Sequence, residues 1–355
     1  MFGELPKLFD RDFAIAYFLP SAAFSAVTYW IVLKFNLAHV VFAFSAESFL
    51  KDIASFGLVS LFGGIILLIA NRGILRLFEG YWPLRMGQRL NWIERRHFRK
   101  LQRENAESDS QIESYELRGL PFPRELQEKR NKIKFLLPRR VPHSEHLVLP
   151  TSFGNTYRAF EAYSFIMYGI DSIPGWYRLL AVIPKEYRGL IDSAKAPLNF
   201  WVNACFLSLL AIVEFYLAAT VAGAISWRGL VSPHARFPWI PLFAFLSFLL
   251  SYSFARRAAE EWGNWVKSAF DLYLPDLRTK LGFPPAASKQ EEFTTWTNFS
   301  VAVLTRSAEL MKSIQEPDSP SPIQSRVRHK LYRRYSRTFF GSRKRIRGRL
   351  NKKNI

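Results

Sequence analysis

The chain has 355 residues, of which 49 are Lys or Arg and 29 are Asp or Glu, so its formal net charge is +20. Its single cysteine, Cys205, excludes a disulfide framework and a metal site built on paired cysteines. The mean hydropathy of −0.02 averages two unlike parts, long apolar stretches and highly charged segments.

Four apolar stretches divide the sequence, and each has about the length that a helix needs to cross a bilayer. The hydrocarbon core is ~30 Å thick, so a helix that rises ~1.5 Å per residue needs roughly 20 apolar residues to cross it. Lipid offers no water to backbone polar groups, so such segments must be helical. The stretches are 13–33, 53–70, 198–227 and 237–255.

The first two stretches carry signals for helix shape and packing. The first is interpreted as a retained helix rather than a signal peptide, because its leader mixes acidic and basic residues. Pro20 is expected to kink this helix, since proline lacks a backbone N–H. In the second stretch, Gly57, Gly63 and Gly64 favour close approach of neighbouring helices.

Positive charge is distributed unevenly around the stretches. Segment 71–197 holds 22 of the Lys and Arg residues and the segment after Ala255 holds 21. Because basic flanks favour the cytoplasmic side, four crossings with both termini in the cytoplasm satisfy every flank. Trp30, Trp227 and Trp239 then fall toward the outer surface, at the headgroup level that tryptophan prefers.

The charged segments are also predicted to be helical. Sparse apolar residues among many charges predict surface helices at 91–107 and 124–137. The second apolar stretch is expected to continue as a helix to Pro83. The fourth is expected to continue to Pro275, with Trp262, Trp265, Ala269, Leu272 and Tyr273 on one face.

One more helix is predicted at 294–314, because five apolar residues there form a narrow stripe at helical spacing. They are Trp296, Phe299, Val303, Leu310 and Ile314.

The predicted fold is an all-α integral membrane protein with four transmembrane helices and a helical cytosolic module. Its parts are a first helix pair in 1–71, a cytosolic insertion at 72–197, a second pair in 198–256, a cytosolic extension at 257–315 and a basic tail at 316–355.

Glu214 is the one charged residue within the apolar stretches. A charge at the bilayer centre costs roughly 2.5–3.5 kcal/mol on insertion scales, so such a residue usually faces the bundle interior or water. Glu214 is therefore either a proton or cation site or a structural group that holds helices together, with Asn203 among its candidate partners.

Four polar residues, Arg158, Glu161, Asp171 and Arg178, are expected to form a cytosolic cluster of structural ion pairs. His143 and His146 flank an acid, but prolines on both sides predict a solvated loop rather than a metal site. The sequence has no phosphate-binding glycine loop, serine-nucleophile motif or zinc-protease motif. We therefore expect no enzyme, cofactor or metal.

The last 34 residues, 322–355, hold 13 Lys or Arg and no acid. Such a segment cannot build a core, and near an anionic membrane each basic residue contributes ~1 kcal/mol of attraction. Nucleic acid would use the same charge, but tethering at a membrane favours lipid. The residues expected to bind anionic lipid headgroups are Arg333, Arg334, Arg343, Lys344, Arg345 and Arg347.

Three strings resemble a group of bacterial multi-pass membrane proteins: LPT…GNTYRAFE at 149–161, YGID…WYRL at 168–179 and FDLY…DL at 270–277. The similarity covers about Phe78–Gly282. In that group as well, a cytosolic segment lies between two hydrophobic pairs, so the resemblance implies a bacterial inner membrane and this architecture. It implies no activity and no catalytic residue.

These observations predict a membrane-anchored interaction or scaffold subunit that binds a cytosolic partner through its helical module. The alternative is a small ion- or proton-translocating protein that uses Glu214. Expected partners are the lipid bilayer, anionic headgroups, and a cytosolic protein or a second copy of the chain; nucleic acid is not expected.

Overall fold

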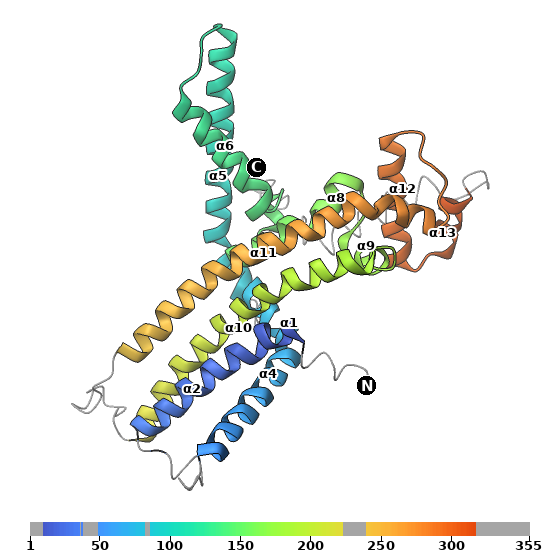
Figure 1. Ribbon diagram of the computed structural model, residues 1–355. Coiled ribbons are helices and arrows are strands. Elements are labelled where there is room, and N and C mark those ends of the chain that lie inside the picture. Colours follow the sequence, from blue (N-terminus) through green and yellow to red (C-terminus); the bar gives the residue numbers. More distant parts are fainter. Residues whose placement is uncertain (1–9, 36, 38–48, 82–85, 223–238, 317–355) are drawn as a thin grey trace, which may run out of the picture. The chain divides into compact units, whose positions relative to one another are not determined.

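The computed structural model describes residues 10–35, 37, 49–81, 86–222 and 239–316. All regular secondary structure in this part of the chain is helical (Figure 1). Four of the helices are long and apolar enough to cross a membrane, which confirms the predicted helical class and the four candidate spans. The chain divides into two compact units, unit 1 from 1–85 and 189–262, and unit 2 from 86–188 and 263–355.

Unit 1 contains the four candidate spans. Two of its long helices, α10 and α11, continue past the unit boundary into unit 2. The helices of unit 1 are α1 (Arg11–Phe13), the π-helix η2 (Ala14–Phe18), α2 (Leu19–Lys34), α4 (Phe49–Glu79), α10 (Lys185–Val221) and α11 (Trp239–Lys280).

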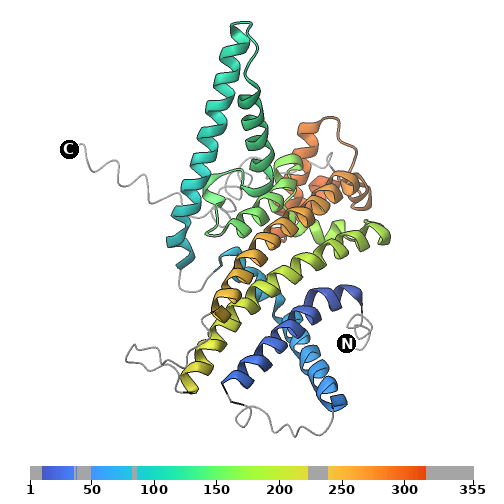
Figure 2. The same cartoon turned by 60° about the vertical axis from the view of Figure 1, so that its left-hand side comes forward.

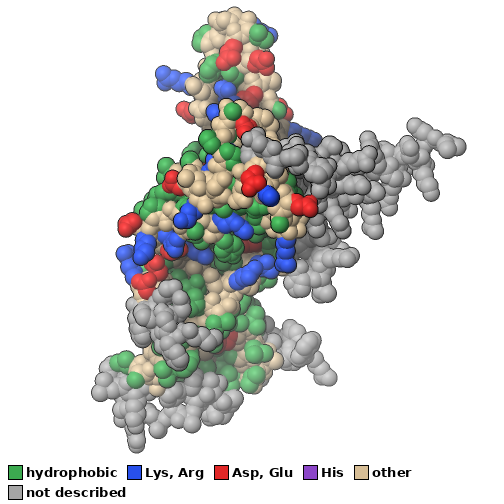
Figure 3. Space-filling view, turned by 90° about the vertical axis from the view of Figure 1, so that its right-hand side faces the viewer, with side chains coloured by type: hydrophobic (Ala, Val, Ile, Leu, Met, Phe, Trp, Pro, Cys, Tyr) green, Lys and Arg blue, Asp and Glu red, His purple; other side chains and the backbone are tan. Residues whose placement is uncertain are grey.

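Unit 1 turns apolar side chains outward. Ile69 is 79% exposed and Leu217 is 65% exposed, whereas Ser60 and Asn203 are fully buried. On the face drawn in Figure 3, the described surface of this bundle is mainly hydrophobic, and most Lys, Arg, Asp and Glu side chains are gathered elsewhere. This pattern is the reverse of a water-soluble core.

The helix is not continuously α-helical at Pro20, the position where a kink is predicted. The chain forms the π-helix η2 just before it, and Pro20 lies in the first turn of α2. A proline is tolerated in a first turn because an N–H there has no α-helical acceptor in its own helix. The irregularity predicted at Pro20 therefore takes the form of a change of helix type.

Small residues bring α4 against the N-terminal helices. A Cβ atom added at Gly63 would collide with the Ser21 hydroxyl, and one at Gly64 would lie 3.3 Å from the Phe18 backbone. The predicted close packing is confirmed at these two glycines. At Gly57 an added Cβ would have no neighbour within 4 Å, so that glycine does not serve packing among the described residues.

Trp30 and Trp239 lie together at one end of unit 1, with ring centroids 5.2 Å apart. They lie beside a buried cluster of Ile31, Phe215, Ala218 and Ile240. The two tryptophans therefore share one level of the bundle, as the interfacial placement requires. Trp227 lies outside the described residues.

Unit 2 is a set of shorter helices. They are α5 (Met86–Leu117), α6 (Arg124–Arg140), the 3₁₀ turn η4 (Glu145–Leu147), α7 (Ser152–Glu161), α8 (Tyr163–Tyr168), α9 (Ser172–Leu179), α12 (Lys289–Thr305) and α13 (Ala308–Gln315), with one end each of α10 and α11.

Helices α5 and α6 form an antiparallel hairpin, and they lie side by side in Figures 1 and 2. Phe98, Ile112 and Ile133 are buried, and the burial of α5 repeats at spacings of three and four residues. Both predicted surface helices are confirmed, and each is longer than its predicted range.

The remaining helices of unit 2 close over an aromatic core. Trp296 and Phe299 are fully buried and Phe270 is 2% exposed. The single helix predicted at 294–314 is wrong, because Arg306 adopts a left-handed conformation (φ 56°) and ends α12. Ser307 then caps α13 by accepting a hydrogen bond from the Leu310 N–H.

The predicted end of α11 at Pro275 is also wrong. The helix continues to Lys280, and Leu277, beyond the proline, is 2% exposed. Proline removes one backbone hydrogen bond, and packing of the next turn compensates for that loss. The buried face runs through Val266, Phe270 and Leu277. Leu272, which is predicted to share a face with Ala269, is 58% exposed, whereas Ala269 is fully buried.

Candidate functional site

One face of α10 carries the polar contacts between the N-terminal helices and the rest of unit 1. The Asn199 amide donates to the Tyr17 hydroxyl (3.0 Å), and the Asn203 amide donates to the Ala16 carbonyl (2.8 Å). Farther along, Thr28 donates to Glu214 (3.0 Å). At about 100° per residue these three α10 positions fall within about 60° of one another. The face therefore acts as a polar seam along η2 and α2.

The Asn203 contact has a specific cause in the sequence. In an α-helix, residue 20 would donate its N–H to the Ala16 carbonyl, but Pro20 has no N–H. The buried Asn203 side chain, 187 residues away in the sequence, supplies a donor to that carbonyl instead. A buried carbonyl without a partner costs ~1–3 kcal/mol, so this contact satisfies a defect that the proline creates.

Glu214 is half-buried and has Thr28 as its hydrogen-bond donor. No Lys, Arg or His pairs with it in the part of the chain that the structure describes. Other polar contacts of α10, Cys205 to the Phe248 carbonyl and Ser208 to Ser247, face α11. The polar groups of α10 thus lie on two faces, and each group bonds to a neighbouring helix.

The structure brings together part of the expected cytosolic cluster. Arg158 and Glu161 form an ion pair (3.2 Å), and Asp171 lies close enough to act on Glu161. Burial raises the pKa of Glu161, Asp171 raises it further, and Arg158 partly offsets both.

Asp171 and Arg178 have other contacts. The Asp171 side chain caps α9 by accepting from the Ile173 N–H, and its own N–H donates to the Ser300 hydroxyl (2.9 Å). Arg178 donates to the Pro174 carbonyl and lies 5.6 Å from the centroid of the Phe299 ring. These contacts join α9 to α12 and serve the fold.

A cluster that the sequence analysis missed is centred on Asp271. Its Oδ1 accepts hydrogen bonds from the hydroxyls of Tyr163 (2.8 Å) and Tyr168 (2.7 Å), so α8 is tied to α11. Burial and the Asp271 carboxylate raise the pKa of Tyr163 to about 12. The partners are more than 100 residues apart in the sequence, and no local pattern pairs them.

The His143–His146 segment forms a surface turn. Ser144 Oγ and His146 Nδ1 are 2.6 Å apart, and Glu145 pairs with Arg99 (3.6 Å). Burial and the nearby His146 lower the pKa of His143. Among the described residues, no group of three His, Cys, Asp or Glu side chains could hold a metal ion.

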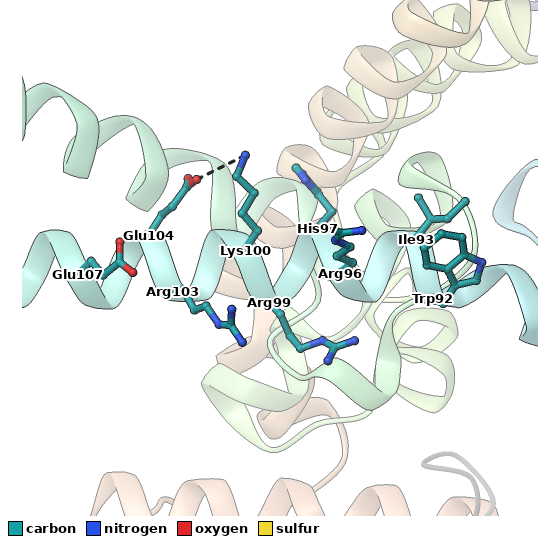
Figure 4. Close-up of a pocket in the computed structure, with 9 residues that line it drawn as sticks. All are labelled: Trp92, Ile93, Arg96, His97, Arg99, Lys100, Arg103, Glu104 and Glu107. Atoms are coloured by element: carbon teal, nitrogen blue, oxygen red, sulfur yellow. Dashed lines mark ion pairs between the residues drawn. The ribbon is translucent and has the colours of Figure 1, made fainter.

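A shallow, open hollow lies along α5 on the side away from α6 (Figure 4). We call the exposed residues on this side the α5 basic face: Trp92, Ile93, Arg96, His97, Arg99, Lys100 and Arg103. Figure 4 shows Trp92 and Ile93 at one end and the acids Glu104 and Glu107 at the other, with Lys100 paired to Glu104 (3.7 Å). No residue of unit 1 contributes to it.

The six tail residues expected to bind anionic lipid lie outside the described residues, as does the rest of 317–355. Comparison of the chain with family models, curated proteins and solved structures finds no match.

Proposed function

We propose that this chain is a membrane-anchored interaction or scaffold subunit that binds a cytosolic partner through unit 2. In this proposal, unit 1 is embedded in a bacterial inner membrane and both termini lie in the cytoplasm. The partner is a cytosolic protein or a second copy of the chain. The chain acts by binding, without enzymatic chemistry of its own.

The observation that carries the proposal is the continuity of α10 and α11. Helix α10 begins in the charged unit 2 and continues without interruption into an apolar candidate span. Helix α11 begins in a candidate span and continues without interruption into unit 2. A segment that leaves a bilayer as an unbroken helix needs no flexible linker. Such helices suit a protein whose task is to hold a module at the membrane surface.

The outward-facing apolar side chains of unit 1 support membrane insertion. Only 17–33% of the most apolar window of each candidate span is buried within the chain, so most of that surface needs an apolar surrounding. The basic charge on 71–197 and after Ala255 supports the cytoplasmic placement of unit 2.

Exposed apolar side chains at the tip of the α5–α6 hairpin support partner binding. Leu117 is 83% exposed and Leu120 is 53% exposed. Exposed apolar side chains that lie close together in the sequence, as these two do, are typical of surfaces that bind another protein.

The proposal is tested by purifying the tagged full chain from membranes and looking for a stoichiometric partner. Leu117→Glu with Leu120→Glu should abolish the association, because both side chains are exposed and the change adds charge at the contact. The matched control is Ile173→Glu with Tyr177→Glu, since both side chains are also exposed (51% and 76%) but lie on α9 of unit 2. Reciprocal purification through the partner should give the same dependence. Equal recovery with all variants would contradict binding through the hairpin tip.

Translocation of ions or protons through Glu214 is the second candidate, because a carboxylate lies within a candidate span. It predicts a conductance or proton flux in proteoliposomes that Glu214→Gln abolishes while the protein stays assembled. The separate polar contacts of α10 favour the structural role of Glu214.

A further inference from the structure

Helix α5 is divided into two oppositely charged halves. Segment 86–103 contains six Lys or Arg and one Glu, whereas 104–116 contains five Asp or Glu and no Lys or Arg. This division is unusual for a surface helix, in which charges of both signs normally alternate.

The acidic half has its counter-charges within the hairpin. Asp109 accepts from Arg130 (2.9 Å) and pairs with Lys134 (2.8 Å) of α6. These contacts also set the register of the antiparallel pair. In that register the last turn of α6, with Arg139 and Arg140, lies toward the basic half of α5. Positive and negative side chains therefore offset each other near the tip of the hairpin, whereas positive charge is in excess at its opposite end.

Little within the described structure neutralises the basic face. Arg96 and Arg103 are exposed and form no ion pair or hydrogen bond with the described residues. Arg99 has a long contact with Glu145 (3.6 Å) and Lys100 one with Glu104 (3.7 Å), both at exposed positions where such pairs contribute little. The excess charge repels itself, so an external anion would lower the free energy of the folded hairpin.

Two exposed apolar side chains belong to the same face. Trp92 is 58% exposed and Ile93 is 53% exposed, one turn before Arg96. A helix with Trp beside Lys and Arg is typical of segments that lie in the headgroup layer, where the ring enters the acyl boundary and the cations meet phosphates. The face is also close to a candidate span in the sequence, since α4 ends at Glu79.

We propose that the α5 basic face binds the surface of an anionic phospholipid membrane, with Trp92 and Ile93 inserted at the headgroup level. Basic clusters that follow a transmembrane helix on its cytoplasmic side recognise acidic lipids by this charge pattern. Lipid is favoured over nucleic acid or an acidic protein because the apolar pair accompanies the charges in the part of α5 that follows the candidate span in the sequence. The inference rests on the proposed membrane anchoring.

The experiment uses the full chain in proteoliposomes, in a Cys205→Ala background, with an environment-sensitive fluorophore on Ile93→Cys. Vesicles are phosphatidylcholine alone or mixed with phosphatidylglycerol, and both carry a lipid quencher at shallow depth. Strong quenching is expected with phosphatidylglycerol and weak quenching without it. In 1 M salt, where the Debye length is about 3 Å, the quenching should fall.

Variants identify the face. Arg96→Gln with Arg103→Gln should lower the ratio of bound to free hairpin about 25-fold, or about five-fold for each charge. The matched control, Arg118→Gln with Lys129→Gln, removes two exposed charges outside the basic face and should leave quenching unchanged. Arg96→Lys with Arg103→Lys should retain it, which separates charge from misfolding.

Each outcome decides between the proposals. Equal quenching in both kinds of vesicle, or none in either, would overturn the lipid assignment. Displacement of the label from anionic vesicles by low concentrations of an RNA oligonucleotide would assign the face to nucleic acid instead. Alkaline carbonate extraction tests the anchoring separately: release of the protein would contradict the proposed function itself. Retention with an unquenched label would contradict only the lipid face.

Discussion

Both units consist of helices, but they place apolar and polar side chains in opposite ways. Unit 2 buries large aromatic side chains such as Trp296, Phe299 and Phe153 and exposes its charges. Unit 1 exposes Ile and Leu side chains and buries Ser and Asn. In unit 2 the burial of apolar side chains can provide the stability, whereas in the proposed membrane setting the apolar side chains of unit 1 face lipid, and the hydrophobic effect does not drive its helices together. The burial of large aromatic side chains therefore stabilises unit 2. Unit 1 is held together by the close approach of its helices and by hydrogen bonds between them.

The largest effect is expected from the aromatic core of unit 2. Phe299→Ala should lower the stability of unit 2 by about 3–5 kcal/mol, because the fully buried ring contacts Trp296 and Phe283 and its loss leaves a cavity. Urea unfolding of the full chain in detergent, followed by limited proteolysis, measures the change. The control is Phe135→Ala, because that ring is 54% exposed. Equal losses of stability for the two variants would contradict the conclusion that buried aromatic side chains stabilise unit 2.

In unit 1, the contact between Asn203 and the Ala16 carbonyl should give the next largest effect. Asn203→Leu is expected to cost about 1–2 kcal/mol, because the carbonyl that Pro20 leaves without its α-helical donor loses a partner. A double-mutant cycle sharpens the test. In a Pro20→Ala background the backbone N–H returns, so Asn203→Leu should cost clearly less there. Unfolding in increasing fractions of denaturing detergent measures all four proteins. Additive costs would contradict the explanation.

The hydrogen bond between Thr28 and Glu214 should contribute less. Interhelical hydrogen bonds in membranes average about 0.6 kcal/mol, so Glu214→Leu and Thr28→Val should each cost about that amount by the same assay. Glu214→Gln keeps an acceptor for Thr28 and should be close to neutral. A large loss of stability for Glu214→Gln, with no loss for Glu214→Leu, would indicate that the charge has a role beyond this bond.

The smallest effect is expected at the surface of unit 2. Hydrogen bonds from Lys134 and Arg130 hold the pKa of Asp109 below its usual value of 3.8. A lowered pKa in the folded state means that the stability from this carboxylate is present above about pH 3.8 and is lost as the pH falls through the folded-state pKa. Asp109→Asn should therefore slightly destabilise the hairpin at neutral pH and have no effect in strong acid. Thermal unfolding monitored by circular dichroism at both pH values measures the difference.

The sequence predicts the parts of this fold that depend on composition and period. The four candidate spans follow from length and absence of charge, and α5 and α6 follow from apolar spacing. The break at Arg306 is harder to predict, because a left-handed arginine is uncommon and Ser307 is the only local sign of a new helix.

Contacts between segments that are distant in the sequence cannot be predicted from composition and apolar spacing. Asn203 was a candidate because it is polar, but nothing near it in the sequence indicates that its partner is the carbonyl four residues before Pro20. The two tyrosines on Asp271 were missed for the same reason. Arg178 donates to the Pro174 carbonyl and lies near the Phe299 ring, whereas the Asp171 side chain accepts from the Ile173 N–H. Nearby groups thus provide partners that the charge pattern alone does not indicate.

The charge order along α5 has a consequence for the helix itself. A helix macrodipole places partial positive charge at the N-terminus and partial negative charge at the C-terminus, so acids are favourable early and bases late. In α5 the bases come first and the acids last, which opposes the dipole at both ends. Segment 86–117, cut out as a peptide, should therefore be a poor helix in spite of its length. Its helicity should fall further at low ionic strength, where the unfavourable ends are least screened.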